Sequence, residues 1–237
     1  MQELRGQVAI VTGASRGIGF GVARALALAG MRLAVCARTE PDIERAGLAL
    51  AALGTEVLAR PCDVSKALDV EGLVAETVER FGRVDVLVCN AGVGRFGAIE
   101  DSREEDLDAV LAVNLKGVFF FARAVFPIFK AQRRGYAITV SSYAGKEGLR
   151  NAGAYGASKF GAIGLTESLL KEGVAYGIRA TSICPGMVDT ELVAGAGVPP
   201  EDMLRVEDVA ETCLFLLRLS DVAVVREVVL QRVGAID

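Results

Sequence analysis

The chain has 237 residues, enough for one α/β domain with a large buried core and short for two. Hydrophobic residues make up 52% of it and charged residues 24%, so we expect a folded chain with little disorder. The formal net charge is −4 with scattered basic residues, which argues against a nucleic-acid partner, and the absence of histidine excludes a Ser-His-Asp triad and histidine-containing zinc sites.

Targeting, membrane and redox signals are weak in this sequence. The first residues lead into an apolar run without a signal-peptide pattern, and the apolar stretch 117–129 is broken by Arg123 and is shorter than the ~20 residues of a membrane span. We therefore expect a cytosolic protein that does not cross a membrane. Five cysteines show no Cys-x-x-Cys spacing and are predicted to be buried apolar residues, not metal or disulfide sites: Cys36, Cys62, Cys89, Cys184 and Cys213.

Strand-like apolar runs alternate with helical patterns along the whole chain. The predicted strands are 8–11, 33–37, 56–60, 84–89, 137–141, 179–184 and 227–233. Such alternation indicates an α/β fold, a three-layer, doubly wound parallel sheet of about seven strands with helices on both faces and the ligand at the carboxyl ends of the strands. We find no repeat or linker and predict a single domain, 1–237, with a short substrate loop around 186–205.

The first predicted strand runs directly into a glycine-rich turn with Gly13, Gly17 and Gly19. Glycine permits the sharp turn and the close approach of a pyrophosphate, which would sit at the amino end of the helix predicted over 18–29. A glycine triplet alone also fits an ordinary strand-turn-helix. The strand before it and the helix after it favour dinucleotide binding.

The end of the second predicted strand bears on the choice of dinucleotide. NAD-preferring folds usually place an acidic residue there, to bond the ribose 2′-hydroxyl. This chain has Arg38, and an arginine can bind a 2′-phosphate, a group that Arg16 in the glycine turn could also reach. NADP(H) is therefore favoured. Glu40 keeps NAD(H) possible, and Arg38 could also be a solvated strand-end charge.

Tyr155 and Lys159 lie four residues apart in a segment that reads as helix, so they share one helix face. A cation beside a phenol stabilises the phenolate and makes the hydroxyl a usable proton donor or acceptor. Taken alone this spacing is weak evidence, because most such pairs are solvated surface residues.

With these motifs in place, the chain resembles the short-chain dehydrogenase/reductase family over nearly its whole length, including 3-oxoacyl-[acyl-carrier-protein] reductase-like members. The fold implied is the Rossmann fold. Ser142 lies thirteen residues before the tyrosine, as the family's serine does, and this spacing selects it over Ser141. The motifs that carry the resemblance are Thr12-Gly13-x-x-x-Gly17-x-Gly19, Asn90-Ala91-Gly92, Asn114, Ser142, Tyr155-x-x-x-Lys159 and Pro185-Gly186-x-Val188-x-Thr190.

The resemblance implies roles for these residues. Tyr155 would be the general acid in carbonyl reduction and the base in alcohol oxidation, and Lys159 would favour its ionised form and bind the nicotinamide ribose. Ser142 would hold the substrate oxygen, and Asn114 would orient a water that relays protons. The implied cofactor-binding residues are Gly13, Ser15, Arg16, Gly17, Ile18, Gly19, Arg38, Asp63, Val64, Asn90, Ala91, Gly92, Tyr155, Lys159, Pro185, Gly186, Val188 and Thr190.

The expected activity is NADP(H)-dependent hydride transfer between the nicotinamide and a small-molecule carbonyl or secondary alcohol, of the ketone or 3-oxoacyl reductase type. An NAD-dependent alcohol dehydrogenase and a non-catalytic dinucleotide-binding regulator remain alternatives; the regulator would have no need of the four catalytic-type residues together. An epimerase or dehydratase would resemble longer chains. The segment between Pro185 and Val206 is short for a substrate lid, so a 3-oxoacyl thioester, a small ketone and a steroid-like ketone all stay open.

Self-association is also expected. Apolar residues in 118–129 surround more of their helix than one sheet-facing stripe needs, and Gly161, Ala162, Gly164 and Leu165 on the next helix would permit close helix packing. We predict a homodimer or homotetramer built through these helices. The C-terminal strand lacks the Asp-Gly-Gly ending common in tetrameric family members, which favours the dimer. The alternative is that helices of the same subunit cover these side chains.

Overall fold

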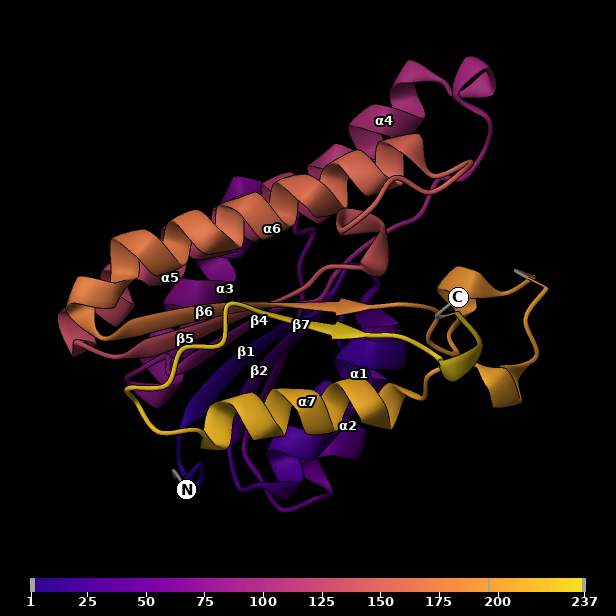
Figure 1. Cartoon of the computed structure of the whole chain (residues 1–237). Coiled ribbons are helices and arrows are strands. Elements are labelled where there is room, and N and C mark those ends of the chain that lie inside the picture. The colour runs from indigo at the N-terminus through magenta and orange to yellow at the C-terminus, as the bar shows by residue number, and fades with distance from the viewer. Residues whose placement is uncertain (1–2, 196, 236–237) are drawn as a thin grey trace.

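A seven-stranded parallel sheet, in the order β3-β2-β1-β4-β5-β6-β7, forms the centre of the molecule (Figure 1). The structure is a computed structural model and describes residues 3–195 and 197–235. The predicted three-layer α/β fold is confirmed, and each predicted strand is present. Their bounds are β1 Val8–Thr12, β2 Arg32–Ala37, β3 Val57–Pro61, β4 Val86–Cys89, β5 Gly135–Val140, β6 Ile178–Pro185 and β7 Glu227–Leu230.

Helices cover both faces of this sheet (Figure 1). On one face lie α1 (Gly17–Leu28), α2 (Glu40–Ala51) and α7 (Val206–Arg218), and on the other α3 (Ala67–Phe81), α5 (Gly117–Gln132) and α6 (Gly153–Gly173). Because side chains alternate along a strand, β1 feeds two cores. Ala9 and Val11 belong to the cluster with α1 and α7, and Val8 and Ile10 to the cluster with α3 and α5. Burial on both faces explains why the strands read as continuous apolar runs.

The last strand is shorter than predicted, ending at Leu230 and not at residue 233. Its only neighbour in the sheet is β6, which ends at Pro185, and the final bond of the pair runs from the Gly186 N–H to the Leu230 carbonyl at 2.7 Å. Beyond that point β7 finds no further strand to pair with among the residues that the structure describes. The chain forms a short 3₁₀ turn, Val233–Ala235.

One helical run is longer than its sequence indicates. Helix α4 (Glu104–Leu111) continues through a π turn, Ala112–Lys116, into α5. Among the described residues this run of 29, Glu104–Gln132, is the one helix long and apolar enough to cross a membrane by length and composition, with 39% of its most apolar window buried inside the molecule. The sequence analysis judged only the apolar stretch 117–129, which by itself is too short to cross a membrane. Core helices pass the same test, and Phe121, Val125 and Phe129 are core residues here.

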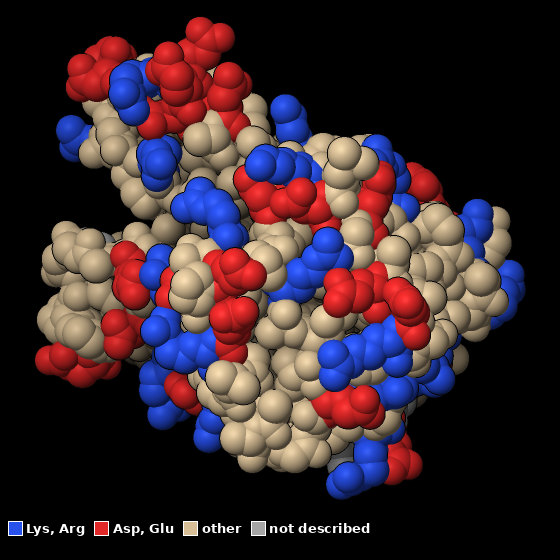
Figure 2. All heavy atoms as spheres, turned by 180° about the vertical axis from the view of Figure 1, so that it is seen from behind, with Lys and Arg blue, Asp and Glu red and all other residues tan. Residues whose placement is uncertain are grey.

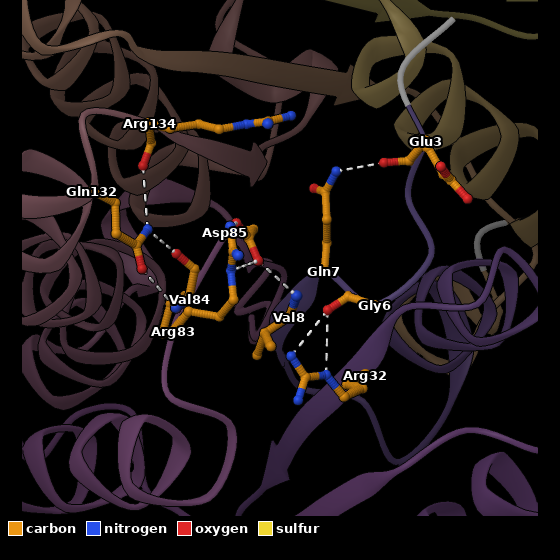
Figure 3. Close-up of polar contacts among 10 residues, drawn as sticks. All are labelled: Glu3, Gly6, Gln7, Val8, Arg32, Arg83, Val84, Asp85, Gln132 and Arg134. Atoms are coloured by element: carbon orange, nitrogen blue, oxygen red, sulfur yellow. Dashed lines mark hydrogen bonds and ion pairs between the residues drawn. The ribbon is translucent and has the colours of Figure 1, made fainter.

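The amino ends of the central strands are joined by polar contacts (Figure 3). Asp85 accepts a hydrogen bond from the Val8 N–H at 2.9 Å and is paired with Arg83 through two bonds of 2.8 and 2.5 Å. The bond to Asp85 raises the pKa of Arg83 above its ordinary value. Gln132 of α5 donates to the Val84 carbonyl at 2.6 Å. These contacts hold the amino ends of the strands together. The predicted catalytic residues lie at the opposite edge of the sheet.

Candidate functional site

Predicted site residues follow the carboxyl ends of β1, β4, β5 and β6, which lie side by side in the sheet. Others follow β2 and β3 or lie on the helical segments between the strands. In Figure 1 an arm containing α4 extends beyond this edge on one side and the segment 186–205 on the other. Figure 2, from behind, shows an open cleft between these two lobes. Parallel α/β sheets bind ligands at this edge, so the cleft is the candidate active site.

The glycine turn takes the shape that its sequence predicts. Gly13 and Gly17 have positive φ angles of 65° and 54°, a region that favours glycine. A Cβ atom at Gly19 would stand 2.2 Å from the Gly13 carbonyl oxygen, so only glycine lets α1 pack this closely. Helix α1 has no side-chain cap on its N-cap residue, Arg16, and no acidic residue in its first turn. Its first N–H groups are left to an anion.

Asn90 fixes this turn to the sheet. Its side-chain nitrogen donates to the carbonyls of Thr12 and Gly13 at 3.0 and 3.2 Å, and the Thr12 hydroxyl accepts from the backbone N–H groups of Asn90 and Ala91 at 2.9 and 3.0 Å. The amide of Asn90 is therefore used to hold the ends of β1 and β4 together. Thr12 therefore has a structural role, which the sequence analysis did not assign although this residue is the first of the glycine motif.

The side of the cleft where we predicted the adenosine of the cofactor, called the adenosine side below, is built from residues that follow β2 and β3. Arg38 and Glu40 are both exposed there, and Val64 is buried beneath. Burial acts to raise the pKa of Asp63, but hydrogen bonds from Ser65 and the charges of nearby bases, including Arg38, outweigh it and leave the pKa lowered. Asp63 is therefore a carboxylate acceptor within the electrostatic reach of Arg38.

The substrate loop touches the glycine turn at two points. Arg16 forms an ion pair with Glu191 at 3.1 Å, and a Cβ atom at Gly17 would lie 3.4 Å from the Thr190 methyl carbon. Val188 pairs with Leu204, which closes the loop at its base. The predicted contact of Arg16 with a 2′-phosphate thus competes with an ion pair inside the chain. Glu191 was not singled out by the sequence analysis.

Tyr155 and Lys159 lie on α6 and are both buried. The Lys159 Nζ is 5.6 Å from the centre of the Tyr155 ring and donates to the Val140 carbonyl at 3.1 Å. The Ser141 hydroxyl donates to the Lys159 carbonyl at 3.0 Å, so Ser141 anchors α6 to the end of β5. No hydrogen-bond partner of the Tyr155 hydroxyl lies among the described residues, and since no fully buried polar side-chain atom there is unpaired, this hydroxyl is accessible to solvent or a ligand.

Asn114 connects α6 to the segment that follows β4. It lies in the π turn, a form often found at functional sites. Its oxygen accepts from the Val93 N–H at 2.8 Å, and its nitrogen donates to the Val93 carbonyl and to the Ser158 hydroxyl, both at 3.0 Å. Ser158 donates in turn to the Tyr155 carbonyl at 2.7 Å. Ser158 is a further residue that the sequence analysis missed, although it directly precedes Lys159.

Ser142 stands at the start of a 3₁₀ turn, Tyr143–Gly145, that lies against α6. Its oxygen accepts from the Ala144 N–H at 3.1 Å and is half-buried, so its own O–H can be donated to a ligand. A Cβ atom at Gly145 would stand 2.9 Å from the Lys159 carbonyl group, so glycine is what allows the turn to approach. This packing holds the turn that begins at Ser142 against α6 at Lys159.

Phe96 covers the exposed side of Tyr155. The two rings are 5.3 Å apart at a 54° angle, and Phe96 is 58% exposed where Tyr155 is 8%. Sequence reasoning missed Phe96. The feature of the sequence that could have indicated it is an aromatic residue between Gly94 and Gly97, shortly after the Asn90-Ala91-Gly92 motif.

The five cysteines are free and buried. Burial raises the pKa of Cys89 and of Cys213 to about 12, so these thiols are poor nucleophiles at neutral pH. Within residues 3–195 and 197–235, no group of three His, Cys, Asp or Glu side chains could hold a metal ion.

The residues present fit a nicotinamide dinucleotide. Uncapped N–H groups at the start of α1 suit a pyrophosphate, and Arg16 and Arg38 lie beyond them on the adenosine side. A Cβ atom at Gly92 would lie 3.4 Å from the Asn114 side-chain oxygen and 3.6 Å from the Lys159 Nζ. The cofactor edge and the catalytic helix therefore meet at Gly92.

Comparison with known proteins agrees with this geometry. The family described as short chain dehydrogenase matches residues 7–198. A 3-oxoacyl-[acyl-carrier-protein] reductase of Synechocystis is 36% identical over 84% of this chain and 81% of its own. An alcohol dehydrogenase of Thermococcus sibiricus, solved with 5-hydroxy-NADP, has a TM-score of 0.89 and 36% identity over 96% of this chain and 97% of its own.

A third similar structure, an NAD⁺-bound xylitol dehydrogenase, has a TM-score of 0.89 and 28% identity over 96% of this chain and 98% of its own. These relatives bind NADP and NAD between them, so nicotinamide dependence is common to the group. The glycine turn, the Tyr155-x-x-x-Lys159 helix and the matched relatives lead to one conclusion. The chain belongs to the short-chain dehydrogenase family and is an NAD(P)-dependent oxidoreductase that acts on CH–OH or carbonyl groups.

Proposed function

We propose that this protein is an NADP(H)-dependent reductase of ketones or 3-oxoacyl compounds, with Tyr155 as the proton donor. The observation that carries the proposal is the buried Tyr155 and Lys159 pair, whose tyrosine hydroxyl is accessible to a ligand at the edge where Arg38 follows β2. Both directions of the reaction use the same groups, so alcohol oxidation runs through the same site.

The bound nicotinamide would supply or accept the hydride. During reduction the carbonyl carbon would receive this hydride with its two electrons, and the carbonyl oxygen would receive the proton of the Tyr155 hydroxyl, which gives a neutral alcohol. The Lys159 ammonium stabilises the phenolate left behind, and the Ser142 hydroxyl holds the substrate oxygen in place. Asn114 already uses its amide on Val93 and Ser158, so in our proposal it positions α6.

The preference for NADP(H) rests on the second strand. Its end carries Ala37 and exposed Arg38 where an acidic residue would serve NAD, and arginine suits a 2′-phosphate. The solved relative from Thermococcus sibiricus carries an NADP derivative, which supports this choice. The NAD⁺-bound xylitol dehydrogenase keeps an NAD-dependent alcohol dehydrogenase as the second candidate, and exposed Glu40 is the residue that would serve it.

Absorbance of the reduced nicotinamide, measured with NADPH and NADH over a panel of ketones and 3-oxoacyl thioesters, tests this proposal. We expect turnover with at least one carbonyl class and a lower KM for NADPH than for NADH. Equal or better use of NADH would remove the NADP assignment. Tight cofactor binding without turnover on any carbonyl or alcohol would favour the non-catalytic regulator.

We also propose a cytosolic homodimer formed through α5 and α6. Phe119 is 45% exposed on α5, and Phe160 and Gly164 are exposed on α6. The surface is smaller than predicted, because Ala162 faces its own core and Leu115 covers Gly161. A dimer is favoured over a tetramer. Light scattering should give about twice the 24.9 kDa of one chain. A monomer mass would refute the interface.

A further inference from the structure

Exposed apolar side chains gather around the catalytic tyrosine. Large hydrophobic residues at the surface are ordinary when they are single, and informative when several segments present them together. Three segments bordering Tyr155 do so: 94–99, 149–155 and 186–205. Their exposed members are Phe96, Ile99, Leu149, Met187 and Leu192.

The first of these segments, 94–99, contacts both of the others. The Gly97 N–H donates to the Asn151 carbonyl at 2.8 Å, and the end of the Ile99 side chain lies 3.2 Å from where a Cβ atom of Gly153 would stand. A Cβ atom at Gly94 would meet Phe96 at 2.5 Å and Leu192 at 3.2 Å. Phe96 and Leu192 therefore approach from different walls of the cleft, and a ligand that reaches Tyr155 passes between apolar surfaces.

Both walls of the cleft are negatively charged. Residues 91–111 contain six acidic residues and two arginines, a net charge of −4, and residues 186–205 contain four acidic residues and one arginine, a net charge of −3. The net charge of −4 already counts Arg95 and Arg103, which both pair with Asp106. In the second segment, Glu191 is paired with Arg16. Red side chains gather on the upper lobe beside the cleft in Figure 2.

The third segment changes the balance little. Arg150, which is exposed, is the one charged residue in 149–155. Together the two walls carry more negative charge than the net −4 of the whole chain. An anionic substrate that approaches Tyr155 between these walls, away from the start of α1 where the cofactor's pyrophosphate would sit, is repelled at short range, even with physiological screening of ~8 Å.

We propose that the substrate is a free, uncharged ketone with a ring or branched hydrocarbon group beside the carbonyl, and that Phe96 and Leu192 hold this group. The inference rests on the proposed carbonyl reductase function and narrows its substrate class. It sets the 3-oxoacyl thioesters carried by an acidic protein aside, since both their phosphate linker and their carrier would face the acidic walls. Phe96 selects the substrate by contact with its hydrocarbon part.

Matched substrates separate this proposal from the function on which it rests. The panel contains a cycloalkyl or aryl ketone and one linear 3-oxoacyl group presented as an uncharged N-acetylcysteamine thioester, as a coenzyme A thioester and on an acyl carrier protein. We expect kcat/KM to be highest for the ring ketone and to fall by at least about tenfold from the uncharged thioester to the carrier-bound one. The highest kcat/KM on the carrier protein would overturn the substrate class. No turnover with any of them would overturn the reductase function instead.

Variants test the two observations separately. Phe96→Ala should raise the KM for the ring ketone about tenfold, and Phe96→Leu should restore most of the loss, because an apolar contact is what is needed. The NADPH Kd from cofactor fluorescence and the pH profile of kcat should stay unchanged. The matched control is Phe215→Ala, because Phe215 is also an exposed phenylalanine but lies on α7. An unaltered KM in Phe96→Ala would overturn the role of Phe96.

The charge argument has its own test. Glu104→Lys combined with Glu105→Lys should lower the KM for the carrier-bound thioester and leave that for the ring ketone unchanged, with the difference shrinking at high salt. If the carrier-bound thioester is insensitive to both the charge reversal and salt, the acidic walls do not select the substrate.

Discussion

The catalytic half of the cleft and its adenosine half are built differently. In the catalytic half, Asn114, Ser158 and Lys159 are buried, and their polar atoms are bound to backbone or to one another. In the adenosine half, Arg16 and Arg38 are exposed, and the ion pair that Arg16 makes is also at the surface.

This difference separates two kinds of function. Buried, fully paired groups are held in one geometry before any ligand binds, which is what proton transfer requires. Exposed charges gain little from their pairs in water and are free to rearrange around a ligand. Changes in the catalytic half should therefore alter turnover or stability, and changes in the adenosine half should alter which cofactor binds.

The largest expected effect is that of Tyr155→Phe. It removes one hydroxyl and keeps the ring that contacts Phe96, so turnover should fall by roughly 10²–10⁴-fold with little change in the NADPH Kd. Steady-state kinetics and fluorescence titration measure the two quantities. Tyr143→Phe is the control, because its hydroxyl bonds Glu147 at the surface. Near-normal turnover in Tyr155→Phe would end the proposed mechanism.

Asn114→Ala should have the next largest effect, on stability as well as on turnover. It removes the partner of the Val93 N–H and carbonyl, at up to about 1–3 kcal/mol for each group left unpaired. It also removes one of the two partners of the buried Ser158 hydroxyl, which keeps its bond to the Tyr155 carbonyl. Thermal unfolding should shift down by several degrees, and kcat should fall because α6 is less firmly held. An unchanged unfolding curve would show that the network does not support the site.

Arg38→Asp tests the adenosine half. Loss of a charge-assisted contact should weaken NADPH binding by roughly ten- to a hundredfold and shift preference toward NADH, without lowering the unfolding temperature. Arg24→Asp makes the same change of charge at an exposed position of α1 and should leave the preference as it is. If the unmodified protein binds NADH tightly and Arg38→Asp does not alter this, Glu40 becomes the ribose contact.

The smallest effect concerns pH. The folded-state pKa of Asp63 is lowered from its ordinary value of 3.8, so its ionised form favours folding above that value, and the contribution is lost as the pH falls through the lower, folded-state pKa. Urea unfolding should find Asp63→Asn slightly less stable than the parent at neutral pH, with the gap closing in acid. Glu79→Gln, an exposed residue of α3, is the control. A gap that persists unchanged at low pH would contradict the electrostatic origin.

Patterns within one short segment were predictable from sequence, because local chemistry determines them. The glycine turn requires Gly13 and Gly19 whatever the rest of the chain does, and the helical spacing of Tyr155 and Lys159 follows from the period of the helix. Contacts between distant loops were not predictable. Neither Phe96 over Tyr155 nor Arg16 with Glu191 is marked by periodicity or composition, because loop conformation depends on the packed sheet beneath it.

The same reasoning explains Ser158 and the long helical run. Ser158 acts through Asn114, 44 residues away in the chain, and only the folded sheet brings them together. The π turn Ala112–Lys116 has no distinctive composition, so the joining of α4 to α5 could not be read from sequence. Asn114 was the one residue of this turn that the sequence analysis had singled out.

Because of that π turn, the direction in which the faces of α4 point depends on the number of residues between α4 and α5. An α-helix advances about 100° per residue, and a π turn accommodates one residue more than the α-helical turn it replaces. Removing one residue from Ala112–Lys116 would let α4 and α5 join as a plain α-helix, with α4 rotated by about 100° relative to α5. The wall of the cleft would then present a different face to the substrate. A single-residue change in chain length, with no change to any catalytic side chain, could therefore alter what this enzyme accepts.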